Sequence, residues 1–558
     1  MRTLLVSPLF AVVTACGGDD RPPDTTADTA PDTTPDTTVD ASSDTSPDTD
    51  VTVAPSDAFA LGVEYTEHGL GPIYGQAGVR WTKTHLEEFR WGAVEPSPPV
   101  GGVHSYDWRC TDDTVRTWQA AGVVDIMSYL VPDSLWGSSK VETILGKEVP
   151  TDLLPKPEHM DDYVAWVGAL AERYDHDGVD DMDGLVAPIR FWVVGAEWTG
   201  FWPTGDADDY LTLLTATRDA LLAADPEAKI GLIPFMLVDV FEGNAPSEAE
   251  IALRLADPPP NWRKSTAGMM RLLDHPELFD FVDVHSLGDY TEVPPTLSWF
   301  RAQMAARGYE RPIWFDDAFP IGYLANFHIG GAGLPAWYPV TEAQYQSVYD
   351  LLVAVAKLAE PAYTPAMRWI RAEVAAGLVK KVVVAAGEGA AGIQIGNTED
   401  WMTDREAGLR HGVVNFIGAA AMMGLVDVTH PAGYAGCAER TAGARRPGWY
   451  NLARLATAFA DTTTVTRIDG LATGVWAYRF RRASGDLVVA WHEDGVLQLP
   501  GESETPVSVT IPWTSKDRVR VTPATTDPDI PEPSTVERPV VGGVVTLELT
   551  SVPVFVEP

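Results

Sequence analysis

The feature that most constrains the fold is a repeated alternation of short apolar segments with amphipathic helical segments between residues 58 and 459. Strands are predicted at Ala58–Tyr65, Gly78–Lys83, Val123–Leu130, Ile189–Gly195, Ala228–Pro234, Phe279–Ser286, Pro312–Phe315 and Gly392–Ile395. Helices are predicted at Asp112–Ala121, Asp161–Arg173, Asp208–Ala223, Ser265–Asp274, Leu297–Arg307, Arg371–Ala386 and Gly448–Phe459. Eight such units predict an α/β fold, a (β/α)8 TIM barrel with parallel strands inside a layer of helices. The alternative is an open doubly wound sheet, but no glycine-rich phosphate turn follows the first strand, which weakens its nucleotide-binding version.

Beyond residue 460 the helical pattern stops, and short strands follow one another between turn residues. These strands are predicted at Val465–Ile468, Gly474–Phe480, Asp486–Trp491, Val507–Ile511, Arg518–Val521 and Gly543–Leu549. Strands without intervening helices pair in antiparallel fashion. We therefore expect a C-terminal antiparallel β-sandwich over residues 460–558, following a barrel domain over residues 58–459.

The first residues have the layout of an export signal. Arg2 supplies a positive charge, and Thr3–Val13 is mostly apolar but too short to span a membrane. The run ends at Ala15-Cys16, which resembles a bacterial lipoprotein box with Cys16 as the lipidated residue. Residues 1–15 are therefore predicted to be a signal peptide; the alternative is an ordinary secretory signal with a chance cysteine. Gly17 stands where aspartate commonly marks inner-membrane retention, so we expect a lipid anchor in the cell envelope, at the outer membrane or cell surface.

The stretch from residue 16 to 57 is composed mainly of Thr, Asp and Pro, with aspartates recurring every four residues. The repeated positions are Asp24, Asp28, Asp32, Asp36, Asp40, Asp44 and Asp48. So few apolar groups cannot offset the entropy that ordering would cost, and proline and charge repulsion favour an extended chain. This stretch is predicted to be a disordered tether.

Composition excludes some function classes. Asp plus Glu number 79 against 40 Lys plus Arg, a net charge of -39, so a nucleic-acid partner is not expected. Three cysteines are too few for a disulfide scaffold or a four-cysteine zinc site. Cys110 and Cys437 are expected in loops after the second and eighth strands, and export permits a disulfide between them, which the sequence leaves open.

Polar residues gather where the predicted strands end. The fourth strand leads into Glu197, the sixth ends at His285 and the seventh ends at Asp316 and Asp317. In a barrel of this kind the active site lies at the carboxyl ends of the strands. Paired carboxyl groups there suit cleavage of a glycosidic bond, in which one acid protonates the leaving oxygen while the other attacks the sugar or activates water.

Several segments together resemble clan A glycoside hydrolases, nearest to families five and thirty-nine. They are Arg80–Lys83 (RWTK), Phe89–Pro96 (FRWGAVEP), Tyr106–Trp108 (YDW), Arg190–Glu197 (RFWVVGAE), Arg311–Asp317 (RPIWFDD), Arg446–Tyr450 (RPGWY) and Thr550–Glu557 (TSVPVFVE). The resemblance covers the chain from residue 58 to its end. It implies a glycosidase, with Glu197 at the acid/base position and Asp317 at the nucleophile position.

The sequence departs from the clan at two positions. Ala196 stands where the clan usually has asparagine, and Asp317 stands where it has glutamate. Retaining enzymes hold the two carboxyls about 5–5.5 Å apart and inverting enzymes about 6.5–9.5 Å. Loss of a methylene withdraws the Asp317 carboxyl by roughly 1–1.5 Å, which moves the gap towards the inverting range unless the backbone shifts. Three outcomes stay open: a retaining enzyme, an inverting enzyme with Asp317 or Asp316 as base, and a sugar-binding barrel without catalysis.

Further residues are candidates for binding the substrate or a calcium ion. For substrate binding these are Trp91, Trp198, His285, Tyr290, Asp316, Glu399 and Trp401, although aromatic residues serve as often in a core. Asp175, Asp177 and Asp181 surround a glycine in an acidic loop, which is a weak pattern for structural Ca²⁺, and a solvated acidic loop is the favoured interpretation. No redox or nucleotide cofactor is expected.

The sequence as a whole predicts an envelope glycosidase that cleaves O-glycosidic bonds in an oligo- or polysaccharide. Glu197 would be the general acid, and Asp317 the nucleophile or base. The alternative from another class is a carbohydrate-binding or scaffold protein that keeps the barrel without turnover. An unrelated barrel hydrolase or lyase would be favoured if Glu197 and Asp317 did not share one site.

Overall fold

The fold was analysed in a computed structural model, which describes residues 59–85, 88–144, 147–150, 154–198, 206–237, 240–241, 247–256, 266–321, 341–357, 360–396, 398, 400, 422–429, 440–513 and 517–558. Its first sheet runs in the order β7-β6-β3-β2-β1-β11-β10-β9-β8, and every pairing is parallel. The strands are β1 (Ala60–Val63), β2 (Trp81–Lys83), β3 (Asp125–Leu130), β6 (Phe191–Val194), β7 (Lys229–Gly231), β8 (Phe235–Met236), β9 (Val282–His285), β10 (Ile313–Ala318) and β11 (Gly392–Ile395).

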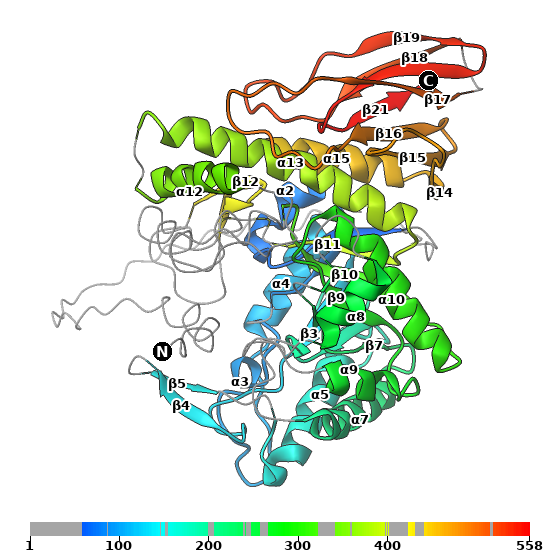
Figure 1. The fold of residues 1–558 in the computed structure, drawn as a ribbon. Coiled ribbons are helices and arrows are strands. Elements are labelled where there is room, and N and C mark those ends of the chain that lie inside the picture. The colour runs from blue at the N-terminus through cyan, green and yellow to red at the C-terminus, as the bar shows by residue number, and fades with distance from the viewer. Residues whose placement is uncertain are drawn as a thin grey trace, which may run out of the picture.

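The sheet closes on itself through the segment that carries β7 and β8. Its first part, β7, pairs with β6, and its second part, β8, pairs with β9. Gly231 also forms an isolated parallel bridge with Phe281. These two parts count as one barrel strand, which confirms the predicted (β/α)8 barrel, with all eight predicted strands in place (Figure 1).

Helices surround the barrel and agree with most of the predictions. They are α4 (Arg109–Ala120), α5 (Met160–Tyr174), α7 (Ala207–Ala224), α8 (Glu248–Ala256), α9 (Thr266–Leu273), α10 (Val293–Ala306), α12 (Glu342–Ala356), α13 (Tyr363–Gly387) and α15 (Pro447–Phe459). Neither α8 nor α12 was among the predicted helices, nor was the hairpin of β4 (Val141–Ile144) and β5 (Lys147–Pro150). A signal for α12 was available, because Thr341 and Gln344 form a capping box at its start.

Side chains alternate between the two faces of each barrel strand, as a parallel barrel requires. At the amino end of the strands, four aromatic rings fill the barrel interior, with ring centroids 5.0–6.3 Å apart. These rings belong to Trp81, Phe191, Phe281 and Trp314. Glycines on neighbouring strands make room for them, since a Cβ on Gly392 would lie 2.5 Å from Trp314. This apolar layer closes one end of the barrel, so the polar layer above it has an apolar floor.

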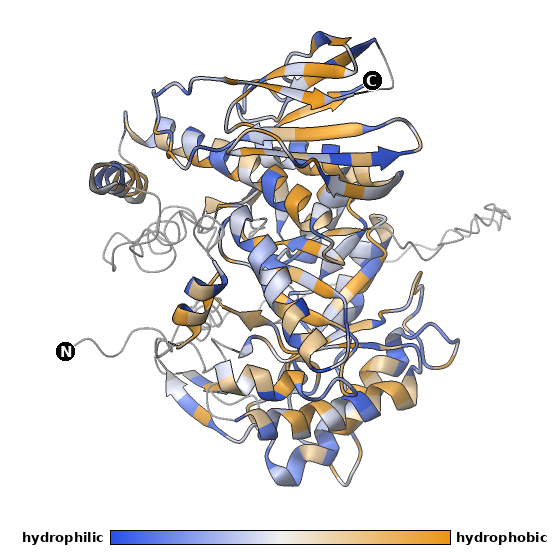
Figure 2. Cartoon of the chain, turned by 45° about the vertical axis from the view of Figure 1, so that its right-hand side comes forward, coloured by the Kyte–Doolittle hydropathy of each residue, from blue (hydrophilic) through white to orange (hydrophobic). Residues whose placement is uncertain are grey.

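The C-terminal strands form a separate antiparallel sheet that folds into two layers, as predicted (Figure 1). They are β14 (Thr462–Arg467), β15 (Val475–Arg482), β16 (Leu487–His492), β17 (Val507–Pro512), β18 (Arg518–Pro523), β19 (Val536–Val541), β20 (Val544–Leu549) and β21 (Val554–Glu557). Figure 2 shows hydrophobic stretches along these strands.

The C-terminal sheet packs on the barrel through α13 and α15, which lie between the two (Figure 1). Alternate residues of β15 explain how one strand serves two cores. Val475 and Ala477 belong to the core of the sandwich, while Tyr478 and Phe480 belong to the larger core shared with the barrel. Because both faces of β15 are buried, the sandwich is held firmly against the barrel.

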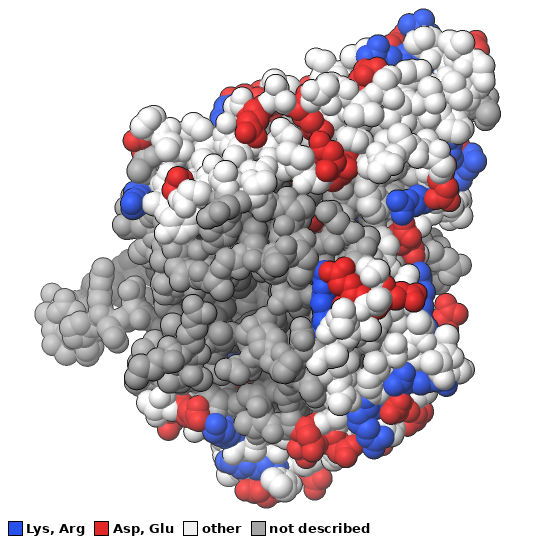
Figure 3. Space-filling model, viewed as in Figure 1, with Lys and Arg blue, Asp and Glu red and all other residues white. Residues whose placement is uncertain are grey.

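The described surface carries charged side chains of both signs. Figure 3 shows acidic and basic side chains interspersed over the described part of one face, with no broad basic area among them. Within the described ranges, no helix combines the length and the apolar character needed to cross a lipid bilayer.

Candidate active site

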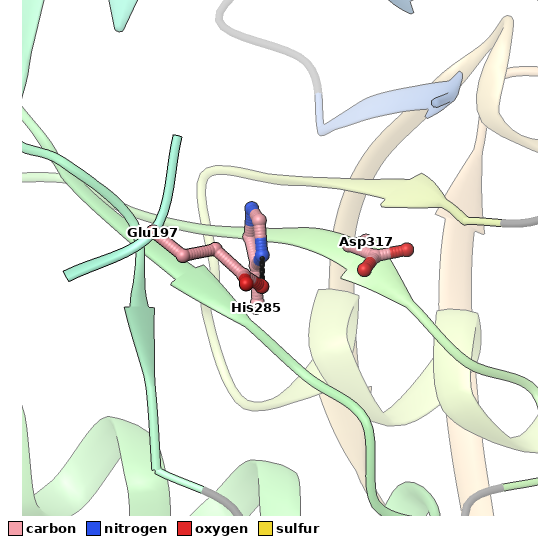
Figure 4. Close-up of side chains that lie close together, drawn as sticks. All are labelled: Glu197, His285 and Asp317. Carbon is pink, nitrogen blue, oxygen red and sulfur yellow. Dashed lines mark hydrogen bonds and ion pairs between the residues drawn. The ribbon is translucent and has the colours of Figure 1, made fainter. Parts of the chain in front are cut away.

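Glu197 and Asp317 meet at the carboxyl end of the barrel strands, as the sequence predicts. Glu197 follows β6 and is 3% exposed, and Asp317 lies in β10 and is 7% exposed. One oxygen of each carboxyl and a ring nitrogen of His285 all lie within 4.8 Å of one another. Figure 4 shows the Glu197 carboxyl directed at the His285 ring, with Asp317 on the other side of that ring. The two carboxyl groups therefore share one site.

A chain of buried hydrogen bonds extends from Glu197 across the barrel. His285 Nδ1 lies 2.5 Å from Glu197 Oε1, and His285 Nε2 lies 3.1 Å from the Tyr129 hydroxyl. Tyr129 in turn donates to Glu64 Oε1 at 2.5 Å. One oxygen of each carboxyl at the front of the site is not used: Glu197 Oε2 and Asp317 Oδ1 have no hydrogen-bond partner among the described residues. Buried carboxyl oxygens without a partner are costly in a fold, so both oxygens call for a partner that the described residues do not supply.

Lys83 is the cation at the centre of the barrel. Its ammonium group lies 2.7 Å from Asp283 Oδ2, 3.2 Å from Asp316 Oδ2 and 3.3 Å from Glu64 Oε1. All four side chains are fully buried. Asp316, a predicted substrate ligand, is thus engaged with Lys83, in the layer behind Asp317.

Burial and like charges shift the proton affinities of this cluster. Burial, with the nearby Glu64 charge, raises the pKa of Glu197 to about 8. Burial also raises the pKa of Asp317 well above its usual range, and it raises that of Glu64 to about 7 against the opposing attraction of Lys83. Burial and Lys83 hold the pKa of His285 well below its usual value. Near neutral pH the site therefore contains a protonated Glu197 beside a neutral imidazole.

A backbone irregularity brings Asp317 into the site. In β10 Phe315 pairs with Ile393 and Ala318 pairs with Ile395, so two residues of β10 face one of β11. Such a bulge bends the strand and redirects side chains. Asp317 has a φ of +41°, a left-handed conformation that is uncommon outside glycine. Without the bulge, Asp317 would follow the outward-facing Phe315 and point away from the barrel interior.

The bulge changes the carboxyl gap that the short side chain of Asp317 would otherwise give. The sequence places the carboxyl gap nearer the inverting range unless the backbone shifts. The backbone does shift, and the nearest oxygens of Glu197 and Asp317 approach within 4.8 Å. This approach is shorter than the spacing of about 6.5–9.5 Å that is typical of inverting enzymes.

The same three side chains offer ligand atoms of the kind that transition metals prefer. An imidazole nitrogen with two carboxylate oxygens within 4.8 Å is compatible with a divalent ion after small side-chain movements. The second acidic cluster, Asp175, Asp177 and Asp181, also brings oxygens within 4.8 Å. Part of its capacity is already used, because Asp181 accepts hydrogen bonds from the amides of His176 and Gly178. The solvated acidic loop stays the favoured interpretation of this cluster, and a calcium ion there stays the untested alternative.

Two tryptophans that were predicted to bind substrate lie in the core instead. Trp91 is fully buried and donates to Glu95, and its ring packs on Trp136 and Tyr163. Trp198 is 1% exposed and packs on Tyr210. An aromatic ring that binds sugar needs an accessible face, so the prediction that Trp91 and Trp198 bind substrate is wrong. Both rings serve the core.

Tyr290 was also predicted to bind substrate, but it lies at the junction with the sandwich. Its ring centroid is 5.1 Å from that of Trp476 and 5.4 Å from that of Trp491. Only 5% of Tyr290 is exposed. This prediction is therefore wrong, because the residue turns towards the C-terminal domain rather than towards Glu197.

Other sequence predictions have mixed outcomes. Cys110 is disulfide-bonded, and it lies in the first turn of α4 rather than in a loop. The correction follows from an earlier helix start, at Arg109. Four further predictions lie outside the described residues: the second cysteine Cys437, the candidate ligands Glu399 and Trp401, and the predicted lipidation residue Cys16.

Four buried residues of the barrel are functional candidates that were not predicted from the sequence: Glu64, Lys83, Tyr129 and Asp283. A signal was present, because each is a polar or charged residue within a predicted strand, and Glu64, Lys83 and Tyr129 lie at or next to the carboxyl end of theirs. Such residues face either the site or the core, and the strand register that decides between the two is not visible in the sequence.

Two solved structures have the same overall fold as this chain. No family model and no curated protein matches the sequence. Among solved structures, a monomeric β-xylosidase from Caulobacter crescentus has a TM-score of 0.51 at 17% identity, covering 90% of this chain and 96% of the other. A conserved exported protein from Bacteroides fragilis has a TM-score of 0.50 at 10% identity, covering 90% of this chain and 97% of the other. The chain thus shares its overall fold with these two proteins.

Proposed function

We propose that the protein is a glycoside hydrolase that cleaves O-glycosidic bonds in a glycan with retention of configuration. Glu197 is the general acid/base and Asp317 the nucleophile. The observation that carries the proposal is the shared site of these two buried carboxyl groups, each with one unpartnered oxygen. The clan A resemblance of the surrounding strands agrees with it.

In the first step Glu197 gives its proton to the leaving oxygen while Asp317 attacks the anomeric carbon. The glycosidic bond breaks, and an ester forms between the sugar and Asp317. Glu197, now a carboxylate, takes a proton from water, and that water displaces Asp317 to release the sugar. The raised pKa of Glu197, about 8, suits this acid role because the group holds its proton at neutral pH.

The test uses a panel of 4-nitrophenyl glycosides together with xylan and β-glucan. The β-D-xyloside comes first, because a β-xylosidase shares the fold. Wild-type protein should release sugar, and Glu197→Gln and Asp317→Asn should each lower kcat by 1,000-fold or more. The exposed Glu310→Gln serves as the matched control and should keep full activity. NMR of the first-formed anomer should show retention.

Two results would change the interpretation. Inversion of configuration would replace Asp317 as nucleophile by a base role. Sugar binding without release from any substrate would favour the alternative, a carbohydrate-binding protein that keeps the barrel. A chelator control separates both from metal-dependent hydrolysis, since EDTA should leave the activity unchanged.

We also propose that the protein works in the cell envelope, on a lipid anchor at Cys16. Its support is the apolar run that ends at this cysteine and the acidic tether that follows. Mass spectrometry of the mature N-terminus should find acyl groups on Cys16. Cys16→Ser should move the protein from the membrane to the soluble fraction, and an unmodified Cys16 in the mature protein would end this proposal.

A further inference from the structure

Two consecutive residues of β10 both direct carboxyl groups into the barrel. Asp316 lies 3.2 Å from the Lys83 ammonium, and Asp317 shares the site with Glu197. In a regular strand, neighbouring residues point to opposite faces. The bulge and the left-handed conformation of Asp317 allow both carboxyl groups to point inward. They also take the Asp317 amide out of the regular hydrogen-bond pattern between the strands. That buried amide needs another acceptor.

Glu64 supplies the acceptor. Its Oε2 accepts a hydrogen bond from the Asp317 amide at 2.5 Å. Its Oε1 is held on the other side by the Tyr129 hydroxyl at 2.5 Å and faces the Lys83 ammonium at 3.3 Å. The side chain is fully buried, so the carboxyl group has a fixed position at the end of β1.

We propose that Glu64 is a positioning residue that holds Asp317 in its bulged conformation and thereby carries the shorter aspartate arm to the sugar. The inference rests on the proposed function, because it assigns Asp317 a position that matters for attack. Glu64 itself touches no reacting atom in this scheme. Its contribution is to fix where the Asp317 backbone lies, and a displacement of about 1 Å at a reacting group lowers rates by about 100-fold.

Gly396 provides independent support from the opposite side. A Cβ at this position would lie 2.8 Å from the Asp317 Cα and would collide with its Oδ1. The bulge therefore occupies the space that a side chain on β11 would need. Glu64, directly after β1, and Gly396, directly after β11, lie on either side of the bulge.

Two substitutions of Glu64 test the length of its side chain separately from its carboxyl group. Glu64→Gln keeps the length of the arm and an oxygen that accepts from the Asp317 amide. Glu64→Asp keeps the carboxyl group but withdraws the oxygen by roughly 1–1.5 Å, beyond hydrogen-bond reach. At pH 6, on 4-nitrophenyl β-D-xyloside or whichever panel glycoside the wild type cleaves best, the Gln variant should lose clearly less kcat than the Asp variant, although its NH2 group faces Tyr129 and Lys83 in place of a carboxyl oxygen. The Asp variant should lose about 100-fold in kcat with little change in KM.

A second substitution tests the geometry directly. If Glu64→Asp lets the strand relax, a longer side chain at 317 should recover reach. Glu64→Asp combined with Asp317→Glu should be at least fivefold more active than Glu64→Asp alone, whereas Asp317→Glu in the wild-type background should lower kcat. Full activity of the Asp variant, or a Gln variant as inactive as the Asp variant, would overturn the proposal in favour of no role or a charge role.

Two further measurements keep the result clear. If Glu64→Asp does not fold, as judged by circular dichroism, Gly396→Ala tests the same bulge and should lower kcat by about 100-fold; unchanged kcat would overturn the proposal. If the wild type cleaves no glycoside, the proposed function fails by itself. The positioning role is then decided by the crystal structure of Glu64→Asp, in which a φ of residue 317 still near the wild-type value would refute it.

Discussion

The imidazole of His285 lies 2.5 Å from the carboxyl of Glu197, Nδ1 to Oε1, and this contact orients the carboxyl group in the ground state. A phenol has one hydrogen, and Tyr129 gives it to Glu64. The Tyr129 oxygen must then accept a hydrogen from His285 Nε2, 3.1 Å away. His285 Nδ1 is consequently bare, and the hydrogen between His285 and Glu197 belongs to Glu197.

This arrangement predicts the tautomer of His285. While Glu64 is ionised, at pH 7.5, His285 should be neutral and carry its hydrogen on Nε2, because burial lowers its pKa and Tyr129 accepts that hydrogen. Nitrogen-15 NMR of the ring measures this directly. Tyr129→Phe removes the acceptor and should allow the Nδ1–H form to appear. An imidazolium signal at pH 7.5 in the wild type would contradict the assignment.

The rate should depend on pH through both carboxyl groups. Activity should fall as pH rises through about 8, because Glu197 then loses the proton that it donates. It should also fall towards acid, and from a pH well above the usual range for an aspartate, because burial raises the pKa of Asp317. A profile of kcat/KM against pH in wild-type protein measures both limbs. An alkaline limb below pH 6 would be inconsistent with Glu197 as the acid.

The same shift predicts how stability changes with pH. Folding raises the pKa of Glu197, so between about pH 4.5 and 8 the folded state keeps a proton that the unfolded state loses. Below this window both states are protonated and the stabilising difference is fully present; it is lost as pH rises through 8. The Tm of Glu197→Gln minus that of wild type should therefore grow from pH 5 to pH 8. In the exposed control Glu310→Gln the difference should stay flat.

Removal of the central cation should destabilise the barrel. Lys83→Met leaves Glu64, Asp283 and Asp316 buried without a positive partner, a change expected to lower the free energy of unfolding by about 3–5 kcal/mol. The loss should be smaller at pH 5, where the carboxyl groups can take up protons. Urea unfolding at pH 5 and pH 8 measures it. Lys140→Met, which removes an exposed pair with Glu142, should cost less than about 1 kcal/mol.

Substitutions of Trp91 test whether its ring stabilises the core or binds the sugar. Trp91→Ala should lower the free energy of unfolding by about 3–5 kcal/mol, because the fully buried ring packs on Trp136 and Tyr163. Trp91→Phe should cost clearly less and leave KM unchanged. A raised KM in Trp91→Phe with unchanged Tm would return the ring to the substrate site.

Local patterns in the sequence were sufficient for the architecture and for part of the site. The alternation of apolar strands and amphipathic helices is readable along the chain, and so are the strand ends that carry Glu197, His285 and Asp317. The same reading failed for Trp91, Trp198 and Tyr290. Aromatic residues serve cores and clefts alike, so their type does not say which of the two they line.

The sequence by itself determined that strand–helix units follow one another eight times and that two acidic residues stand at strand ends, because both properties depend on neighbours along the chain. Only the tertiary structure decided that Asp317 turns into the barrel. Its amide bonds to Glu64, 253 positions away, where β1 lies on the far side of β11 from β10. A bulge and its acceptor are set by contacts between distant strands, and strand register, unlike strand existence, is fixed only when the barrel closes.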